Sequence, residues 1–298
     1  MSRILSGKEL AEKMRQEMQI EVAALREKHN IVPGLAVILI GNDPASMSYV
    51  RGKEKACEKV GVISKGYKFD VEFQEAQLLN LIEELNHDPK IHGILVQLPL
   101  PDHINEEKVI YSIDPKKDVD GFHPVSTGKM MIGVPCFLPC TPHGIQQLLV
   151  RNDIEIEGKH VVIIGRSNIV GKPLAMILVQ KKPGANATVT ICHTRTKNMS
   201  AITKTADILV AAVGRPHTVT ADMVKEGVVI IDVGVNRVED KTKKKGYRLI
   251  GDVDFDEVSK KASAITPVPG GVGPMTITML LQNTIQSAKR HAGIEETC

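Results

Sequence analysis

Apolar residues recur with helical spacing near the start of the chain, and a short continuous apolar run follows them. Leu10, Met14, Met18 and Val22 form one stripe of a helix that we expect over residues 7–30. The run LAVILIG, residues 35–41, then ends in glycine, as a buried strand does before a turn. An amphipathic helix followed by a buried strand is typical of an α/β protein.

The same alternation continues to about residue 113. Helices are predicted over residues 46–60, 76–86 and 106–113, and strands over residues 66–71 and 93–100. Strands that are apolar throughout and lie between amphipathic helices indicate parallel pairing with both faces of the sheet covered. The first domain is therefore expected to be a layered α/β domain.

A second alternating series begins at His160. Strands are predicted over residues 160–165, 187–193, 207–214 and 228–234, with helices from residue 171, over 199–206 and over 221–227 between them. This order predicts a Rossmann-like, doubly wound domain. A last helix over residues 276–292 is expected to return to the first domain.

The segment over residues 114–144 is rich in proline, glycine and charge and shows no clear period. We interpret it as the crossing between two domains. Thr141 is expected to cap the next helix, with Pro142 at its first position. The predicted domains are residues 1–140 with 276–298, and residues 141–275.

Composition excludes several classes of protein. The chain has 298 residues and a net charge of +3 with acids and bases interspersed, so neither a nucleic-acid nor a membrane partner is expected. One basic run, over residues 241–248, is interpreted as a solvated hairpin tip. The first residues contain no apolar segment of the kind found in signal peptides, so we expect a soluble cytoplasmic protein.

The cysteines give no sign of a disulfide framework. There are five of them, without a regular spacing, which suits a reducing compartment. Cys136 and Cys140 have three residues between them but no second pair follows, so no metal site is expected.

The turn after the strand at residues 160–165 is a candidate phosphate site. It reads GRSNIVGKP, residues 165–173, and places the N–H groups of a helix start after a strand that ends in Gly165. Compared with the G-x-G-x-x-G fingerprint, Ser167 and Val170 replace the second and third glycines, and Gly171 comes one place late. A plain tight turn is the alternative. The strand and helix around the turn favour a dinucleotide.

The end of the next strand favours NADP over NAD. It reads ICHTRTKN and has no acid to accept a ribose 2′-hydroxyl. Thr194, Arg195 and, from the first turn, Arg166 are suited to a 2′-phosphate, although they can equally be ordinary surface groups. The strand ends at Val213, Gly214 and Val233 are expected near the nicotinamide ribose.

Candidate substrate residues lie in the first domain. Tyr49 and Lys53 are four residues apart and share a helix face, which offers an aromatic ring for stacking and an amine for proton transfer. A surface pair is the alternative. Gln97 interrupts the apolar run GILVQLPL, and either faces a ligand or makes a structural hydrogen bond. Asp118 and Asp120 lack the further ligands of a calcium loop, so one of them is a candidate to bind a heterocycle N–H.

The stretch PVPGGVGPMT, residues 267–276, precedes the last helix. It lacks the Lys-Ser/Thr ending of a P-loop, so a triphosphate site is not expected. Pro269 stiffens the backbone, while Gly270 and Gly273 remove side chains that would block a flat ligand. Thr276 is expected either to cap the last helix or to contact substrate.

Six motifs occur together in an order that resembles one family over essentially the whole chain. The chain resembles the bifunctional methylenetetrahydrofolate dehydrogenase/methenyltetrahydrofolate cyclohydrolase enzymes. The motifs are YVRGKEKAC (49–57), GILVQLPLP (93–101), KDVDGFHP (117–124), PCTPHG (139–144), GRSNIVGKP (165–173) and PVPGGVGPMT (267–276).

This resemblance implies a two-domain homodimer that holds folate between an N-terminal domain and a Rossmann domain. It implies that Tyr49 stacks on folate, that Lys53 is the principal catalytic residue with Gln97 orienting it, and that Asp120 binds the pterin. The resemblance assigns the 2′-phosphate to Arg166 and Thr194. Two alternatives remain: a dehydrogenase without the hydrolase step, and a nucleotide-binding sensor without turnover.

Overall fold

The computed structural model describes residues 2–243 and 246–294, which form two compact units. The three-stranded unit consists of residues 12–140 and 277–294. The six-stranded unit consists of residues 2–11 and 141–276. Each unit has its own sheet and its own apolar core, as the two alternating series predict.

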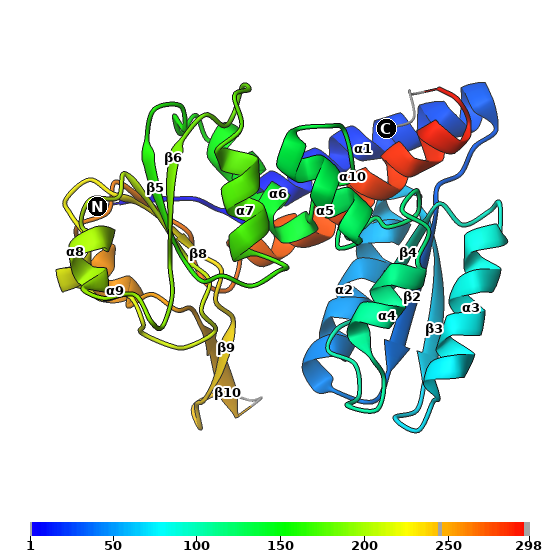
Figure 1. Ribbon diagram of the computed structural model, residues 1–298, viewed down its shortest axis with the longest axis horizontal. Helices are drawn as coiled ribbons and strands as arrows, with labels where there is room; N and C mark the ends of the chain where they lie inside the picture. The colour runs from blue at the N-terminus through cyan, green and yellow to red at the C-terminus, as the bar shows by residue number, and fades with distance from the viewer. Residues whose placement is uncertain (1, 244–245, 295–298) are drawn as a thin grey trace. The chain divides into compact units, whose positions relative to one another are not determined.

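The three-stranded unit contains a parallel sheet in the order β3-β2-β4 (Figure 1). The strands are β2 (Gly34–Ile40), β3 (Ile63–Phe69) and β4 (Gly93–Val96), and the helices that follow them are α2 (Pro44–Val60), α3 (Glu75–His87) and α4 (Glu106–Ser112). Every residue of β2 is buried. Ala36, Ile38 and Ile40 pack in one cluster with apolar residues of α3 and α4, while α2 lies on the other side of the sheet (Figure 1). The expected parallel pairing is confirmed.

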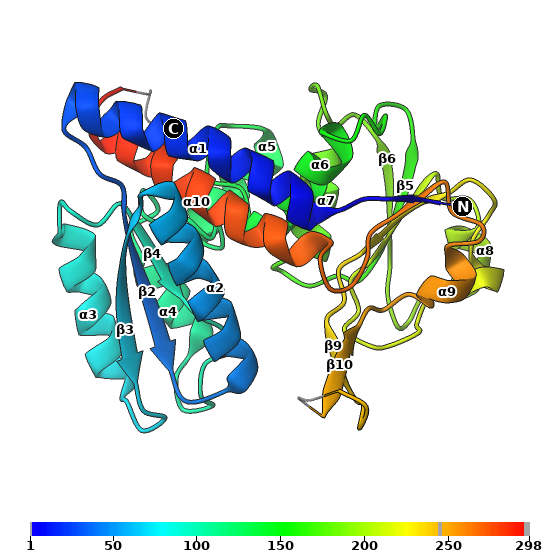
Figure 2. The same ribbon diagram turned by 180° about the vertical axis from the view of Figure 1, so that it is seen from behind.

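Two long helices lie side by side in both views (Figures 1 and 2). They are α1 (Gly7–His29) and α10 (Val272–His291). Arg15 of α1 donates from Nε to Oγ1 of Thr278 in α10 at 3.0 Å. Asn283 donates from Nδ2 to the backbone oxygens of Val119 at 2.8 Å and Leu138 at 3.0 Å. The last helix therefore returns to the first domain, as expected.

Helix α10 begins at Val272, earlier than the residue 276 expected from the sequence. Gly273 and Thr276 are therefore inside its first turns, and Thr276 does not cap it. Oγ1 of Thr276 instead lies 2.9 Å from Oγ1 of Thr141. The proline-rich and glycine-rich composition of this stretch concealed the helix start.

The chain passes from one unit to the other at residues 140–141, within the segment over residues 114–144, but this segment is more regular than its composition suggests. It contains α5 (Pro124–Ile132), which begins after His123 and ends at Gly133 with φ 78°. Its buried residues are only Ser126 and Met130, so no apolar stripe marks it. Residues 114–140 belong to the three-stranded unit.

The next helix, α6 (Cys140–Val150), begins one residue before the expected cap. Thr141 and Pro142 therefore lie in its first turn, where proline is tolerated because the first N–H groups have no helical acceptor. The predicted N-cap at Thr141 was wrong.

The six-stranded unit contains a parallel sheet in the order β1-β11-β8-β7-β5-β6. The strands are β1 (Arg3–Ile4), β5 (His160–Ile164), β6 (Thr188–Cys192), β7 (Ile208–Ala211), β8 (Val229–Asp232) and β11 (Ala264–Ile265); the helices are α7 (Gly171–Leu178), α8 (Met199–Thr203) and α9 (Phe255–Val258). The alternation of strands and helices and the reversal of strand order at β5 confirm the predicted doubly wound domain.

Two details of this unit differ from expectation. Strand β1 pairs with β11 through Arg3 N to Ser263 O at 2.9 Å and Leu5 N to Ile265 O at 2.8 Å, so the first residues lie in the six-stranded unit. Residues 221–227 do not form an α-helix. Only a 3₁₀ turn, Ala221–Met223, is present, and it ends at Val224, whose backbone is extended with φ −125° and ψ 151°.

The basic run begins in the turn of a hairpin and continues into its second strand. Strands β9 (Asn236–Glu239) and β10 (Tyr247–Ile250) pair antiparallel, and residues 241–243 at the turn are exposed, in agreement with the predicted solvated tip. Lys244 and Lys245 lie outside the described residues. Among the helices that the structure describes, none has the length and apolar character needed to cross a membrane.

A buried histidine ties two parallel strands of the three-stranded unit and makes stability depend on pH. Nδ1 of His92 accepts the backbone N–H of Gly34 at 3.0 Å. Burial, reinforced by the positive charges of His291 and Lys117, lowers the pKa of His92 from 6.5 to about 4. The native state therefore favours the neutral ring, and its contribution to stability is present above pH 6.5 and is lost as the pH falls toward 4.

We expect His92→Asn to weaken this pH dependence, because the amide oxygen of asparagine can accept the Gly34 N–H without titrating. Between about pH 7 and about pH 5 the wild-type protein should lose on the order of 1 kcal/mol more stability than the variant, after allowance for solvent screening. Urea unfolding at a series of pH values measures this difference. Parallel stability profiles for the two proteins would contradict the assignment.

Candidate active site

Lys53 is buried on the inner face of α2, although the charged residues Arg51, Glu54 and Lys55 surround it in the sequence. The helix begins after Asp43, whose Oδ2 accepts the N–H of Ser46 at 2.7 Å, and ends at Gly61 in a left-handed conformation. Lys53 lies in the buried row of this helix with Val50 and Cys57 and is only 8% exposed. A lysine in this position is in the low-dielectric interior, where its charged form is disfavoured.

Gln97 is the hydrogen-bond partner of this lysine. Nζ of Lys53 donates to Oε1 of Gln97 at 3.0 Å, and Nε2 of Gln97 donates to the backbone oxygen of Leu98 at 2.7 Å. The main chain holds Gln97 at the carboxyl end of the sheet through its N–H bond to Ile38 O at 2.9 Å. Both polar ends of the amide are thus engaged, and its oxygen is turned toward the amine.

Asp120 completes a small cluster of titratable groups. Burial lowers the pKa of Lys53, and the negative charge of Asp120 opposes that shift. Burial likewise raises the pKa of Asp120, while Lys53 and the thiol of Cys140 oppose it. Burial raises the pKa of Cys140 well above its ordinary value, so this cysteine remains a thiol. Burial thus disfavours the charged forms of both Lys53 and Asp120, while the opposite charge of each favours the charged form of the other.

Tyr49 lies one helical turn before Lys53 and is 38% exposed. Its side chain is partly exposed on α2, one turn before the buried lysine. The structure therefore brings together Lys53, Gln97 and Asp120, and it places Tyr49 next to them on the same helix. The catalytic roles of these four residues stay predictions.

Asp118 has a structural role instead of a ligand role. Its carboxylate accepts the N–H groups of Phe122 at 3.2 Å and His123 at 2.9 Å and the hydroxyl of Ser126 at 2.9 Å. Burial raises its pKa to about 7, against the effect of these hydrogen bonds. Asp118 thus fixes the loop that carries Asp120 and connects it to α5.

The glycine turn of the six-stranded unit has almost no room for side chains. A Cβ on Gly165, which has φ 132°, would lie 2.2 Å from Ala212 O, and a Cβ on Gly171 would lie 2.1 Å from Gly165 O. Oγ of Ser167 accepts the N–H of Val170 at 3.1 Å. The strand β5 therefore passes into α7 through a turn in which backbone packs on backbone, as it does in dinucleotide sites.

The predicted 2′-phosphate residues lie at neighbouring strand ends. Ile164 of β5 is paired with Cys192 of β6. Arg166 lies two residues after Ile164, and Thr194 lies two residues after Cys192. Arg166, Thr194 and Arg195 are exposed. Two cations and a hydroxyl are thus available at one edge of the sheet for a doubly charged group.

The remaining predicted cofactor residues follow β7 and β8. Val213 and Gly214 come directly after β7, and Val233 comes directly after β8 and donates its N–H to Ala211 O at 2.9 Å. Pro269 and Gly270 lie in the turn before α10, where Gly270 has φ 105° and its backbone oxygen accepts the Lys8 N–H at 2.9 Å.

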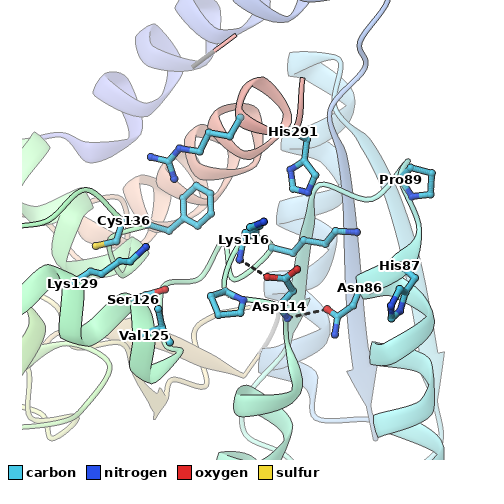
Figure 3. A pocket seen from close by; sticks show the side chains of 14 residues that line it. Asn86, His87, Pro89, Asp114, Lys116, Val125, Ser126, Lys129, Cys136 and His291 are labelled. Carbon is cyan, nitrogen blue, oxygen red and sulfur yellow. Dashed lines mark hydrogen bonds between the residues drawn. The ribbon is translucent and has the colours of Figure 1, made fainter. Parts of the chain in front are cut away.

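A cavity of about 630 Å³ in the three-stranded unit is lined by none of the predicted catalytic, substrate or cofactor residues (Figure 3). Its walls come from the end of α3, residues 114–117, α5, residues 136–137 and the end of α10. Nζ of Lys117 already donates to the oxygens of Leu85 and Asp88 at 2.9 and 2.8 Å, and the guanidinium of Arg290 lies 4.6 Å from the Phe137 ring centre. The cluster of Lys53, Gln97 and Asp120 is the better candidate for chemistry, because its polar groups converge and its pKa values are perturbed.

The residue pattern did not indicate the roles of two residues around this cluster. Cys140, next to Asp120, was considered only as a metal ligand, and Asp118 was weighed as an equal of Asp120. No local pattern distinguishes the two aspartates, because their difference depends on the N–H groups that the folded loop supplies to Asp118.

Family models match both parts of the chain. The catalytic-domain model of tetrahydrofolate dehydrogenase/cyclohydrolase matches residues 5–120, and the NAD(P)-binding-domain model of the same family matches residues 139–292. The curated "Bifunctional protein FolD" of Dehalococcoides mccartyi (strain CBDB1) is 59% identical over 98% of this chain and 98% of its own length. The protein of the same name from Bacillus anthracis is also 59% identical, with 98% of each chain covered.

Solved structures show the same similarity. The bifunctional FolD enzyme from Campylobacter jejuni is 50% identical, with a TM-score of 0.91 over 97% of this chain and 99% of its own. The dehydrogenase-cyclohydrolase of Trypanosoma brucei, complexed with NADP cofactor and inhibitor, is 38% identical, with a TM-score of 0.92 over 97% of this chain and 98% of its own.

Proposed function

The chain belongs to the tetrahydrofolate dehydrogenase/cyclohydrolase family, and we propose that Lys53, positioned by Gln97, carries the proton transfers of its second step. The enzyme oxidises 5,10-methylenetetrahydrofolate to 5,10-methenyltetrahydrofolate with NADP and hydrolyses the product to 10-formyltetrahydrofolate. The hydrogen bond of the buried Lys53 amine to Gln97 is the observation that carries the assignment of roles.

NADP supplies the hydride acceptor in the first step. The positive charge that develops on the folate is shared between two nitrogens, so the protein mainly has to hold the reacting carbon in place. We assign this positioning to the ring of Tyr49, which stacks on the pterin, and to the carboxylate of Asp120, which accepts from its N–H edge. Pro269, Gly270, Gly273 and Thr276 are proposed to line the folate without projecting large side chains.

The second step needs proton transfer at the attacking water and at the leaving nitrogen. A lysine serves only if its neutral form is accessible, and burial lowers the pKa of Lys53 in that direction. Gln97 fixes the amine by accepting one of its protons. Asp120 balances the charge when the amine is protonated.

The activity is tested on the purified protein with 5,10-methylenetetrahydrofolate and either NADP or NAD. We expect formation of NADPH and of 10-formyltetrahydrofolate in the same assay. A dehydrogenase without the second activity would accumulate the methenyl compound, which would then be hydrolysed only at its spontaneous rate. A sensor would bind NADP without forming NADPH.

The cofactor site is proposed to hold the pyrophosphate on the turn that contains Gly165, Ser167, Val170 and Gly171. The closeness of the backbone in this turn supports that placement, since only glycine fits at its two contact points. The 2′-phosphate is assigned to Arg166, Thr194 and Arg195, and the nicotinamide ribose to Val213, Gly214 and Val233.

Replacement of Arg166 by alanine is expected to lower the preference for NADP over NAD by about tenfold to a hundredfold, because a hydrogen bond between two charged groups contributes roughly 1.5–3 kcal/mol. The ratio of kcat/KM for NADP to kcat/KM for NAD measures the effect. Lys181→Ala, which removes an exposed cation of the same unit, is the control and should leave the ratio unchanged. An unchanged ratio in Arg166→Ala would place the phosphate elsewhere.

We further propose that the enzyme is a cytoplasmic homodimer that supplies one-carbon units to purine biosynthesis. Cys57, Cys140 and Cys192 are free thiols, which is usual for a protein of a reducing compartment. Light scattering on the purified protein tests the dimer.

A further inference from the structure

Two aspartates are buried together at the carboxyl edge of the six-stranded sheet, and no step of the reaction uses them. Asp232, the last residue of β8, is 3% exposed, and Asp252, which follows β10, is fully buried. Neither carboxylate forms an ion pair with a described lysine or arginine. Buried carboxylates without a cation must be stabilised by hydrogen-bond donors. The groups that donate to Asp232 and Asp252 therefore show which parts of the chain the two side chains fix.

Asp252 binds the turn that follows β7. Its Oδ2 accepts two successive backbone N–H groups, from Val213 at 2.6 Å and from Gly214 at 2.9 Å. Its Oδ1 accepts the side-chain amide of Asn236 at 2.9 Å. Both oxygens are therefore used, and one of them fixes the main chain at the two residues assigned to the nicotinamide ribose.

Asp232 holds Asp252 in turn. Oδ1 of Asp232 accepts the N–H of Asp252 at 2.9 Å and that of Gly234 at 3.0 Å, and Oδ2 accepts the N–H of Val253 at 3.0 Å. The backbone of Asp252 also accepts the Val219 N–H at 3.1 Å. The carboxylate of Asp252 thus projects from a main chain that is itself fixed.

Two glycines allow this close arrangement. A Cβ on Gly234 would lie 2.1 Å from Oδ1 of Asp252, and a Cβ on Gly251 would lie 1.8 Å from Oδ2 of Asp232. The strand ends after β7 and β8 are therefore packed directly on the two carboxylates. Replacing either carboxylate would therefore remove hydrogen bonds from the main chain at these strand ends.

We propose that Asp252 is a positioning residue for the cofactor: it fixes the Val213–Gly214 turn in the conformation that receives the nicotinamide end of NADP. This inference rests on the proposed placement of NADP at Val213 and Gly214. Asp252 acts through the backbone, since its carboxylate is fully buried and its oxygens are occupied by protein donors. It is required for the dehydrogenase step alone, because Lys53 and Gln97 belong to the other unit.

The test compares Asp252→Ala with the conservative Asp252→Asn. Alanine leaves the two N–H groups of the turn without an acceptor. Asparagine keeps an oxygen for them, and its amide group can donate to Asn236 once the Asn236 amide turns over. We expect KM for NADP to rise roughly tenfold or more in Asp252→Ala and to stay within about threefold of wild type in Asp252→Asn. Hydrolysis of 5,10-methenyltetrahydrofolate should be unchanged in both variants.

Amide hydrogen exchange of the protein without cofactor provides an independent measurement. Exchange at Val213 and Gly214 should be faster in Asp252→Ala than in wild type, and near the wild-type rate in Asp252→Asn. This result does not depend on NADP, whereas calorimetric titration of wild-type protein with NADP tests the proposed cofactor. The two hypotheses can therefore fail separately.

If Asp252→Ala does not fold, Asn236→Ala is used in its place. This change removes only the hydrogen bond from Asn236 to Oδ1 of Asp252, and Asn236 is partly exposed. A rise of about threefold in KM for NADP, with unchanged hydrolysis, is then expected. Equal impairment in the alanine and asparagine variants of Asp252, or unchanged exchange at the turn, would overturn the proposal. So would a wild-type KM in Asp252→Ala, or in Asn236→Ala where that variant is used.

Discussion

Replacing Lys53 by methionine is expected to lower kcat for hydrolysis of 5,10-methenyltetrahydrofolate by about 10²- to 10⁴-fold, the usual contribution of a positioned acid or base. Methionine keeps most of the buried volume of lysine but cannot carry a proton. Since Gln97 donates to Leu98 independently of the lysine, the strand end should keep its structure. The loss is therefore expected in the chemical step and not in folate binding.

The matched control is Lys55→Met, which removes an exposed lysine from the same helix. It should keep the wild-type rate of hydrolysis. Rates are measured with methenyl substrate after subtraction of its spontaneous hydrolysis. Retained hydrolysis in Lys53→Met would refute the role of this lysine, and loss in both variants would point to damage to α2.

Replacing Gly171 by alanine is expected to reduce the stability of the six-stranded unit by about 3 kcal/mol, at the upper end of the cost of overpacking. The new Cβ would lie 2.1 Å from the oxygen and 2.6 Å from the carbon of the Gly165 carbonyl. Both are backbone atoms and cannot move aside as the end of a side chain can. The strand end at Gly165 would have to shift, and binding of NADP should fall with it.

Gly128→Ala is the control for this prediction. Gly128 lies within α5, and a Cβ there would meet nothing within 4 Å. Alanine is favoured over glycine inside a helix by roughly 1 kcal/mol, so this variant should be as stable as wild type or slightly more stable. Thermal unfolding and NADP titration measure both variants. Equal stability of Gly171→Ala and wild type would show that the turn can relax.

The alternation of apolar strands and amphipathic helices was enough to predict the parallel sheets and the Rossmann-like unit. The alternation did not predict elements whose buried residues form no periodic pattern in the sequence. Helix α5 has two buried residues in nine, and the start of α10 lies among glycines and prolines. Strand β1 has two residues and is a strand only because the edge of β11 is available to pair with it.

The site was predictable in part for a related reason. Lys53 occupies a position in the buried row of α2 between Val50 and Cys57, so an apolar stripe interrupted by a lysine is a signal that the sequence contains. The bond to Gln97 joins residues from separate elements and has no local signal. The donors that distinguish Asp118 from Asp120 likewise come from the fold of the loop, as do those that hold Asp252.

The pairing of the first and last segments of the chain has a consequence for biosynthesis. The three-stranded unit includes residues of α10, whose Asn283 occupies the oxygens of Val119 and Leu138, and whose Met279 and Leu280 are buried. A ribosome has to translate the whole six-stranded unit before it reaches α10. The residues of this unit that are made first therefore expose apolar surface until α10 has been synthesised.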